Sequence, residues 1–333
     1  MKIIIPMAGM GKRMRPHTLT VPKPLIPVAG KPIVQHLMED IITVCPEKVD
    51  EMAFVVGRFG SEVEKTLIEI AATLGAKGTI HYQDEPLGTA HAILCAQSAL
   101  NGKVVIAFAD TLFRSEANID PNSDGTIWVK QIDDARHFGV VKVDQNNVIT
   151  DFVEKPTQFV SDLAIIGIYY FRDGENLKNE LQYLIDHNIK DKGEFQLTNA
   201  MENMKNKGLK LVPGKVIEWL DCGNKDATAY TNSRMLQIKF PENYISPQAK
   251  IINSVIHKPC YIADGVEINS CVIGPGVSIG AKSTINQSII SDSIIQSNSQ
   301  ISDAMISNSM IGNYCNYKGK FSDLSMGDYS TGA

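Results

Sequence analysis

The chain has 333 residues, 44% of them hydrophobic, which is enough for one large domain or two moderate ones. Its formal net charge of -5 argues against a general attraction to nucleic acid or to an anionic membrane surface. No apolar stretch reaches the roughly 20 residues that span a bilayer, and the N-terminus lacks the pattern of a secretory signal. Six scattered cysteines without a CxxC pair are typical of a reducing interior, so we expect a cytoplasmic protein.

Up to about residue 235, short apolar runs alternate with amphipathic stretches. This alternation predicts a largely parallel sheet that is covered by helices on both faces. Such a sheet binds ligands at the carboxyl ends of its strands, so we expect functional residues directly after them. The predicted strands are 3–5, 52–56, 104–108, 126–129 and 165–171, and the predicted helices are 33–44, 62–74 and 89–99.

The segment after the first strand is rich in glycine and in basic residues. Gly9 and Gly11 allow a tight turn that presents backbone N–H groups to an anion. Between residues 3 and 38 the chain has no acidic residue but five cationic ones, namely Lys12, Arg13, Arg15, Lys23 and Lys31. This concentration predicts a polyanionic partner such as a triphosphate. The segment fits neither a Walker loop, which needs Ser or Thr after GK, nor a dinucleotide loop, which needs a third glycine.

The full string GxGxRxRPxT, followed by PKP and GKP, resembles the signature of the sugar-phosphate nucleotidyltransferases, or NDP-sugar pyrophosphorylases. Within that family it is similar to the glucose-1-phosphate thymidylyltransferases and the UTP–glucose-1-phosphate uridylyltransferases. The resemblance implies a Rossmann-like α/β fold with a mixed, mostly parallel sheet, the nucleotide-diphospho-sugar transferase fold. It implies transfer of a nucleotidyl group from a nucleoside triphosphate to a sugar 1-phosphate, with release of pyrophosphate. Lys12 is a departure, because the family usually has Thr or Ser there.

Residue roles in the loop follow from this resemblance. It implies that the backbone at Ala8, Gly9 and Gly11 holds the triphosphate. Arg13 would neutralise the leaving pyrophosphate, and Lys23 would contact the α-phosphate, where substitution takes place.

The next candidate segment, YQDEPLGTAHA at 82–92, follows a short predicted strand and opens a helix. Gln83 offers one acceptor and two donors, which complement a pyrimidine edge, and Gly88 lets a base approach the backbone. An ordinary strand-to-helix loop is the alternative. The resemblance implies base binding and favours UTP or dTTP over GTP.

Two carboxylates are candidates for a metal site. Asp110 ends the strongest predicted strand, where it could simply cap the next turn, and Asp221 follows Trp219-Leu220. The resemblance pairs Asp110 and Asp221 on one Mg²⁺, an ion that takes oxygen ligands and bridges phosphates.

The sugar side has its own markers. The resemblance places Gly139 in a sugar-contacting turn and Glu154 and Lys155 in an EKP motif, where they would bind the sugar hydroxyls and the sugar phosphate. An exposed Glu-Lys pair is the alternative. Gly167 would line the sugar pocket through its backbone, and the segment 193–200 would form a wall and a helix cap.

From about residue 244 the helical periodicity ends, and single aliphatic residues recur at steps of five or six. This pattern resembles the hexapeptide repeat of a left-handed parallel β-helix of about three coils, with a β-sandwich as the alternative. We therefore predict a catalytic domain at 1–236, a connector at 237–247 and a β-helix at 248–333. The repeated residues are Ile262, Ile268, Ile273, Ile279, Ile285, Ile290, Ile295, Ile301, Ile306 and Ile311.

Glucose 1-phosphate is the favoured sugar substrate by resemblance, with N-acetylglucosamine or mannose derivatives as alternatives. A bifunctional enzyme whose β-helix is an acyltransferase is a rival, although no histidine follows Ile262 to serve as its base. A non-catalytic regulatory protein that binds sugar nucleotides is a second rival. The exposed edges of a β-helix also lead us to expect a homo-oligomer.

Overall fold

The computed structural model describes residues 1–115, 119–120, 123–320 and 325–327. The chain folds into two compact units. The first comprises Met1–Ile26 and Pro32–Gly223, and the second comprises Pro27–Lys31 and Asn224–Ala333. No helix of the described residues is long and apolar enough to cross a membrane.

The described part of the first unit is built on a nine-stranded mixed sheet with the strand order β10-β9-β11-β6-β1-β4-β5. Strand β8 pairs with β11 and with β12. The neighbours β6, β1, β4 and β5 are parallel, whereas β11 is antiparallel to β6. The strands are β1 (Lys2–Pro6), β4 (Glu51–Val56), β5 (Lys77–Tyr82), β6 (Val104–Ala107), β8 (Gly125–Gln131), β9 (Gly139–Val143), β10 (Ile149–Glu154), β11 (Leu163–Phe171) and β12 (Leu211–Lys215).

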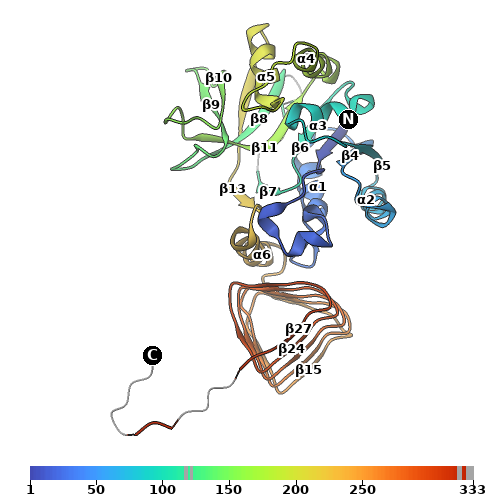
Figure 1. The fold of residues 1–333 in the computed structure, drawn as a ribbon, viewed down its shortest axis with the longest axis vertical. Coiled ribbons are helices and arrows are strands. Elements are labelled where there is room, and N and C mark those ends of the chain that lie inside the picture. Colours follow the sequence, from blue (N-terminus) through green and yellow to red (C-terminus); the bar gives the residue numbers. More distant parts are fainter. Residues whose placement is uncertain (116–118, 121–122, 321–324, 328–333) are drawn as a thin grey trace. The chain divides into compact units, whose positions relative to one another are not determined.

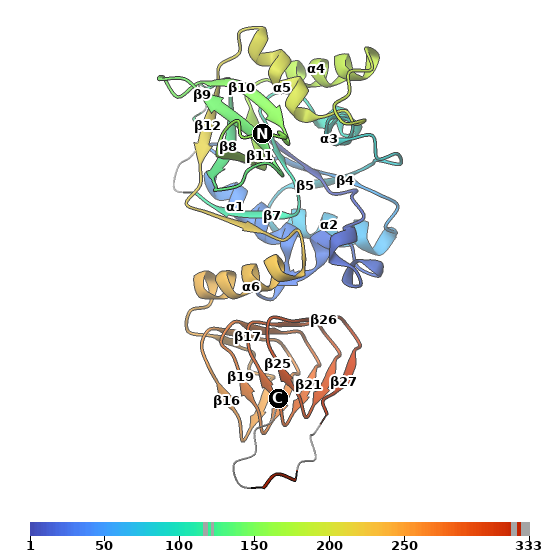
Figure 2. The ribbon, with the colours of Figure 1, turned by 60° about the vertical axis from the view of Figure 1, so that its left-hand side comes forward.

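Helices cover both faces of this sheet, as predicted. Figures 1 and 2 show α3, α4 and α5 on one side of the strands and α1 and α2 on the other. Strand β1 is buried on both faces, with Ile3, Ile4 and Ile5 all inaccessible to solvent, which explains its unbroken apolar run. The helices are α1 (Ile33–Val44), α2 (Ser61–Thr73), α3 (Thr89–Cys95), α4 (Gly174–Asp186) and α5 (Leu197–Asn206).

The strand order changes direction beside β1. The chain passes from β1 to β4 and β5 on one side, then returns to β6 on the other side. The residues that follow β1 and those that follow β6 are therefore neighbours at one edge of the sheet. This reversal is the position where open α/β sheets bind ligands.

A two-stranded antiparallel ribbon brings a distant segment to the same edge. Strands β7 (Thr111–Arg114) and β13 (Glu218–Asp221) pair so that Asp221 lies opposite Thr111. The N–H of Cys222 donates to the carbonyl oxygen of Asp110 at 3.0 Å. The two carboxylates that the sequence resemblance paired thus belong to adjacent strand ends.

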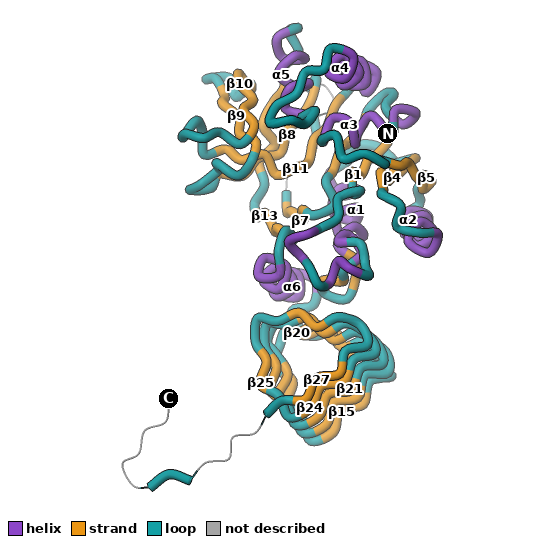
Figure 3. Tube along the Cα trace, in the orientation of Figure 1, coloured by secondary structure: helices purple, strands orange, loops and turns teal. Residues whose placement is uncertain are grey.

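The second unit contains a parallel β-helix with three sheets, consistent with the left-handed form that the repeat predicted (Figure 3). Equivalent positions recur after 17 residues from Ile262 to Ile279 and after 16 residues from Ile279 to Ile295, so each coil is short. The strands are β14 (Tyr244–Ile245), β15 (Lys250–Ile252), β16 (Val255–Ile256), β17 (Cys260–Ile262), β18 (Glu267–Asn269), β19 (Val272–Ile273), β20 (Val277–Ile279), β21 (Thr284–Asn286), β22 (Ile289–Ile290), β23 (Ile294–Ile295), β24 (Gln300–Ser302), β25 (Met305–Ile306), β26 (Met310–Ile311) and β27 (Asn316–Lys318).

All ten predicted aliphatic residues belong to the core of this β-helix or pack against it. The ladder also begins earlier than predicted, because Ile245, Ile251 and Ile256 occupy the same register positions one coil before Ile262. The stack is therefore longer than the three coils expected.

Helix α6 (Lys225–Lys239) packs on the coils, and one of its contacts comes from a buried asparagine. Asn232 is inaccessible to solvent. Its Oδ1 accepts from the N–H of Ala29 at 2.9 Å and from the Ser278 hydroxyl at 2.7 Å, and its Nδ2 donates to the carbonyl oxygen of Gly276 at 3.0 Å. This asparagine therefore joins three segments of the second unit. The domain boundary at residue 236 stays a prediction. The packing of the chain places α6 in the same compact unit as the coils.

We expect Asn232→Ala to destabilise the second unit by about 3 kcal/mol, because it leaves buried donors and acceptors unpaired. Urea unfolding should show a lower midpoint than in the wild type. Asn146→Ala is the matched control, since Asn146 is exposed and its replacement should leave the midpoint unchanged. Equal midpoints for the two variants would contradict this role of Asn232.

Candidate active site

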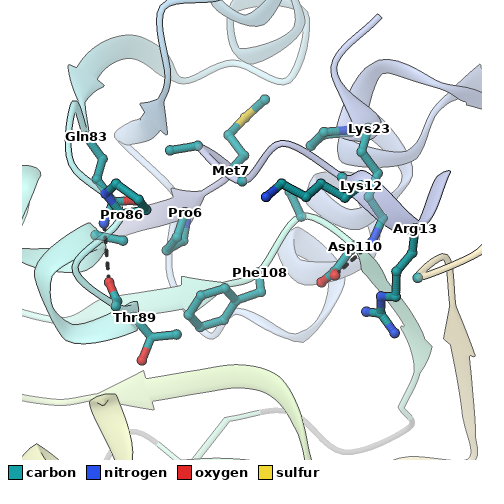
Figure 4. Close-up of a pocket in the computed structure, with 18 of the residues that line it drawn as sticks. Pro6, Met7, Lys12, Arg13, Lys23, Gln83, Pro86, Thr89, Phe108 and Asp110 are labelled. Carbon is teal, nitrogen blue, oxygen red and sulfur yellow. Dashed lines mark hydrogen bonds and ion pairs between the residues drawn. The ribbon is translucent and has the colours of Figure 1, made fainter. Parts of the chain in front are cut away.

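A cavity of about 450 Å³ lies at the carboxyl ends of β1 and β6 (Figure 4). Its volume is in the range of small-molecule binding sites. Eight predicted site residues line it, namely Ala8, Gly9, Gly11, Arg13, Lys23, Gln83, Gly88 and Asp110. The structure therefore brings the predicted triphosphate and base residues and one of the two predicted metal ligands to one place, while Asp221 is not among the lining residues.

The glycine loop is held in a tight turn. Gly11 has a φ of 55°, a left-handed conformation that favours glycine, and its carbonyl oxygen accepts from the Thr18 hydroxyl at 2.9 Å. A Cβ on Gly11 would lie 3.1 Å from the Cβ of Lys23, so glycine also permits the close packing of that lysine. A Cβ on Gly9 would meet no atom within 4 Å. The loop thus leaves open space beside Gly9 for a ligand.

Lys23 is the central cation of the site. It is only 8% exposed, and its Nζ lies 2.9 Å from Oδ2 of Asp110. Burial and the negative charge of Asp110 both raise the pKa of Asp221, whereas the positive charges of Lys23 and Arg13 act in the opposite direction. The cluster therefore combines two neighbouring carboxylates with two cations.

Asp110 and Asp221 can hold a hard divalent cation. Carboxylate oxygens are the donors that Mg²⁺ prefers, and Asp110 lies near enough to Asp221 for its negative charge to raise the pKa of Asp221, with burial as the larger cause. Among the residues that the structure describes, no third His, Cys, Asp or Glu joins them in a cluster. Phosphate oxygens of a substrate and water would complete such a site.

The other end of the cavity is formed by Gln83 and Gly88. Gly88 has a φ of 118°, and a Cβ there would lie 2.4 Å from the carbonyl oxygen of Phe195, so only glycine fits. The loop around Gly88 is fixed because Phe195 N donates to Leu87 O at 2.8 Å and Ala90 N donates to Phe195 O at 2.9 Å. The Nε2 of Gln83 lies 3.3 Å from the carbonyl oxygen of Gly88 (dashed in Figure 4).

The predicted sugar residues form a second group that does not line the cavity. Gly139 and Glu154 lie opposite each other in β9 and β10, and Lys155 Nζ lies 3.4 Å from Oε1 of Glu154. Gly167, in β11, accepts from the N–H of Phe108 at 3.0 Å. Because Phe108 lines the cavity, Gly167 lies directly behind its wall.

Three further residues line the cavity, namely Lys12, Phe108 and Glu194. From the sequence, Lys12 counts only among the cations of the loop, Glu194 belongs to the predicted wall 193–200 as a possible sugar contact, and Phe108 has no predicted role. The side chain of Lys12 is exposed and points into the cavity (Figure 4), and this ammonium group makes no hydrogen bond or ion pair within the described ranges. Phe108 carries no signal in the sequence, because an aromatic residue at the end of a strand is ordinary.

The reversal in strand order, the glycine loop and the paired carboxylates define a phosphate-binding α/β protein. The model of the nucleotidyl transferase family matches residues 2–237, and the chain belongs to that family. This match confirms the resemblance predicted from the sequence.

Relatives agree with this family, and a solved structure agrees with the fold. The chain is 28% identical to a glucose-1-phosphate thymidylyltransferase of Streptomyces antibioticus over 86% of its own length and 85% of the relative. It is 30% identical to the bifunctional protein GlmU of Methanococcus vannielii, with 61% of this chain and 47% of that protein covered. A UDP-glucose pyrophosphorylase from Acinetobacter baumannii superposes with a TM-score of 0.58 at 20% identity, over 72% of this chain and 94% of that one. The last comparison supports the predicted fold.

Proposed function

We propose that the chain transfers a nucleotidyl group from a nucleoside triphosphate to a sugar 1-phosphate. The observation that carries the proposal is the cluster of Lys23, Asp110 and Asp221 beside the glycine loop. The alignment with a thymidylyltransferase over 85% of that relative's length supports dTTP or UTP as the nucleotide and glucose 1-phosphate as the sugar substrate.

The reaction is an in-line displacement. An oxygen of the sugar phosphate forms a bond to the α-phosphorus, and the bond from that phosphorus to the oxygen bridging to the β-phosphate breaks, releasing pyrophosphate. The attacking oxygen is already anionic, so the site needs no general base. It must instead bring two polyanions together, which requires positive charge and orientation.

The described side chains divide this task. The loop from Ala8 to Gly11 presents backbone N–H groups to the β- and γ-phosphates, and Arg13 stabilises the leaving pyrophosphate. Lys23, held by Asp110, offsets charge at the α-phosphate. Asp110 and Asp221 would hold Mg²⁺, which supplies further positive charge at the phosphates.

The group behind the cavity wall provides the sugar side. Glu154 accepts hydrogen bonds from sugar hydroxyls, and Lys155 holds the sugar phosphate. Gly139 keeps this turn compact, because a Cβ there would lie 3.1 Å from Oε2 of Glu154. Gly167 contributes its backbone.

The test is release of pyrophosphate by the purified protein with Mg²⁺, each of UTP, dTTP, GTP, CTP and ATP, and several sugar 1-phosphates. Release that requires both substrates supports the proposal, and the best pair names base and sugar together. Folded protein that releases none with any pair would overturn it.

Lys12 gives a further prediction at the triphosphate end. We expect Lys12→Thr, which installs the residue usual in the family, to raise the KM for the nucleotide about tenfold, because a charged hydrogen bond to phosphate is lost. The KM for the sugar phosphate and kcat should change little. Lys65→Thr, on the exposed surface of α2, is the control. An unchanged nucleotide KM in the Lys12 variant would show that this side chain does not contact the triphosphate.

A further inference from the structure

One side chain that does not line the cavity contacts the residue expected to bind the base. His91, in the first turns of α3, places its Nδ1 3.1 Å from Nε2 of Gln83. The same Nε2 lies 3.3 Å from the carbonyl oxygen of Gly88. Gln83 itself lines the cavity (Figure 4), whereas His91 is not among the lining residues.

These two contacts determine which way the amide of Gln83 points. A carbonyl oxygen can only accept a hydrogen bond, so the Gln83 atom beside the oxygen of Gly88 must be the NH₂ group. The oxygen of Gly88 cannot turn away, because it also accepts from the N–H of Ala92 at 3.0 Å inside the helix. Since the NH₂ group also faces Nδ1 of His91, that nitrogen must be the unprotonated one, with the ring proton on Nε2.

Both amide protons of Gln83 are therefore used within the protein. The atom left for a ligand is Oε1, which can only accept. Uracil, thymine and guanine each carry a ring N–H at the centre of the Watson–Crick edge, whereas cytosine and adenine carry an unprotonated, accepting nitrogen at that point. A Gln83 side chain that offers only an acceptor therefore favours bases of the first group and disfavours those of the second.

We propose that His91 is a positioning residue that selects nucleotides whose base carries this ring N–H. It acts by holding the amide of Gln83 with its oxygen toward the ligand, and it touches neither base nor phosphate itself. This inference rests on the proposed function, since it assumes that the nucleotide base occupies the Gln83 end of the cavity.

The experiment measures equilibrium binding of UTP and of CTP by calorimetry, without sugar phosphate, in the wild type and in two variants. These nucleotides have rings of the same size, and their Watson–Crick edges differ only at N3 and C4. We expect the wild type to bind UTP at least about tenfold more tightly than CTP. With UTP, the N3–H of the base donates a hydrogen bond to Oε1 of Gln83, whereas with CTP two acceptors, N3 and Oε1, face each other. His91→Leu removes the acceptor that holds the amide in one orientation. The preference for UTP over CTP should therefore fall to threefold or less, which corresponds to about half the free energy of a hydrogen bond.

The second variant separates positioning from packing. In His91→Asn the side-chain oxygen lies close to the position of Nδ1 and can accept from Gln83, so the preference for UTP should return. His81→Leu, which removes another half-buried histidine beside the same loop, should keep the wild-type preference.

The inference and the proposed function fail in different ways. Nucleotide binding without a preference for UTP, or a full preference in His91→Leu, would overturn the inference while pyrophosphate release still supported the enzyme. Absence of any nucleotide binding by the folded wild type would overturn both.

Discussion

Replacing Lys23 by alanine is expected to lower kcat by about 10²–10³-fold, corresponding to roughly 3–4 kcal/mol of lost transition-state stabilisation. Lys23 is nearly buried, and its ion pair with Asp110 fixes the ammonium group before substrate arrives. A charge held in this way costs no reorganisation when negative charge develops at the α-phosphate. Because the benefit arises in the transition state, the KM for the nucleotide should change much less than kcat.

Steady-state pyrophosphate release measures this effect. Lys65→Ala is the matched control, because it removes an exposed lysine whose partner Glu69 lies 3.9 Å away, and it should retain full turnover. Thermal unfolding of Lys23→Ala separates a loss of chemistry from a loss of fold. A folded Lys23→Ala enzyme within about fivefold of wild-type turnover would remove this residue from the mechanism, since a preorganised charge is worth far more.

The architecture was largely predictable from the sequence, because the spacing of apolar residues along the chain reflects which side chains are buried. The apolar run in β1 and the aliphatic ladder from Ile262 to Ile311 both reflect side chains that the structure buries. The predicted ladder began at Ile262, although Ile251 and Ile256 of the first coil lie within the predicted β-helix at 248–333. Coils of 16 or 17 residues also explain why many steps were five instead of six.

The candidate site was only partly predictable. The residues at the ends of the strands could be found from sequence motifs. The closeness of Asp110 and Asp221, however, depends on the pairing of β7 with β13, and no local sequence spacing encodes that pairing. The contact between His91 and Gln83 depends on side-chain directions at the start of α3. Sequence patterns fix which face of an element a residue occupies, and they do not fix which polar atoms meet there.

The carboxylate pair leads to a prediction in which stability and activity change in opposite directions. We expect Asp221→Asn to lower turnover by about two orders of magnitude or more. The variant loses one of the two protein ligands of a metal ion that would stabilise the transition-state charge on the phosphates by several kcal/mol. In the presence of EDTA the same variant should unfold at a higher temperature than the wild type. The measurements are pyrophosphate release with Mg²⁺ and thermal unfolding without metal at neutral pH.

The sign of the stability change follows from the titration of Asp221. Burial and the charge of Asp110 raise its pKa in the folded chain, so folding favours the protonated form. The stability that this proton contributes is fully present below the pKa of the unfolded chain and is lost as the pH rises through the higher folded value. At a pH above that folded value the wild type therefore carries the full cost of an ionised Asp221, and a neutral asparagine of the same shape removes that cost.

Asp110→Asn is the contrasting variant. It should lose turnover as severely, yet it should not gain stability, because it removes the carboxylate that pairs with the nearly buried ammonium of Lys23. A site selected for metal and phosphate binding is expected to be unstable where it is empty, and the carboxylate whose pKa is raised by folding should show this. Equal or lower thermal stability of Asp221→Asn in EDTA would mean that the cations of the loop already neutralise both carboxylates, and the case for a resident metal ion at this pair would lose its physical basis.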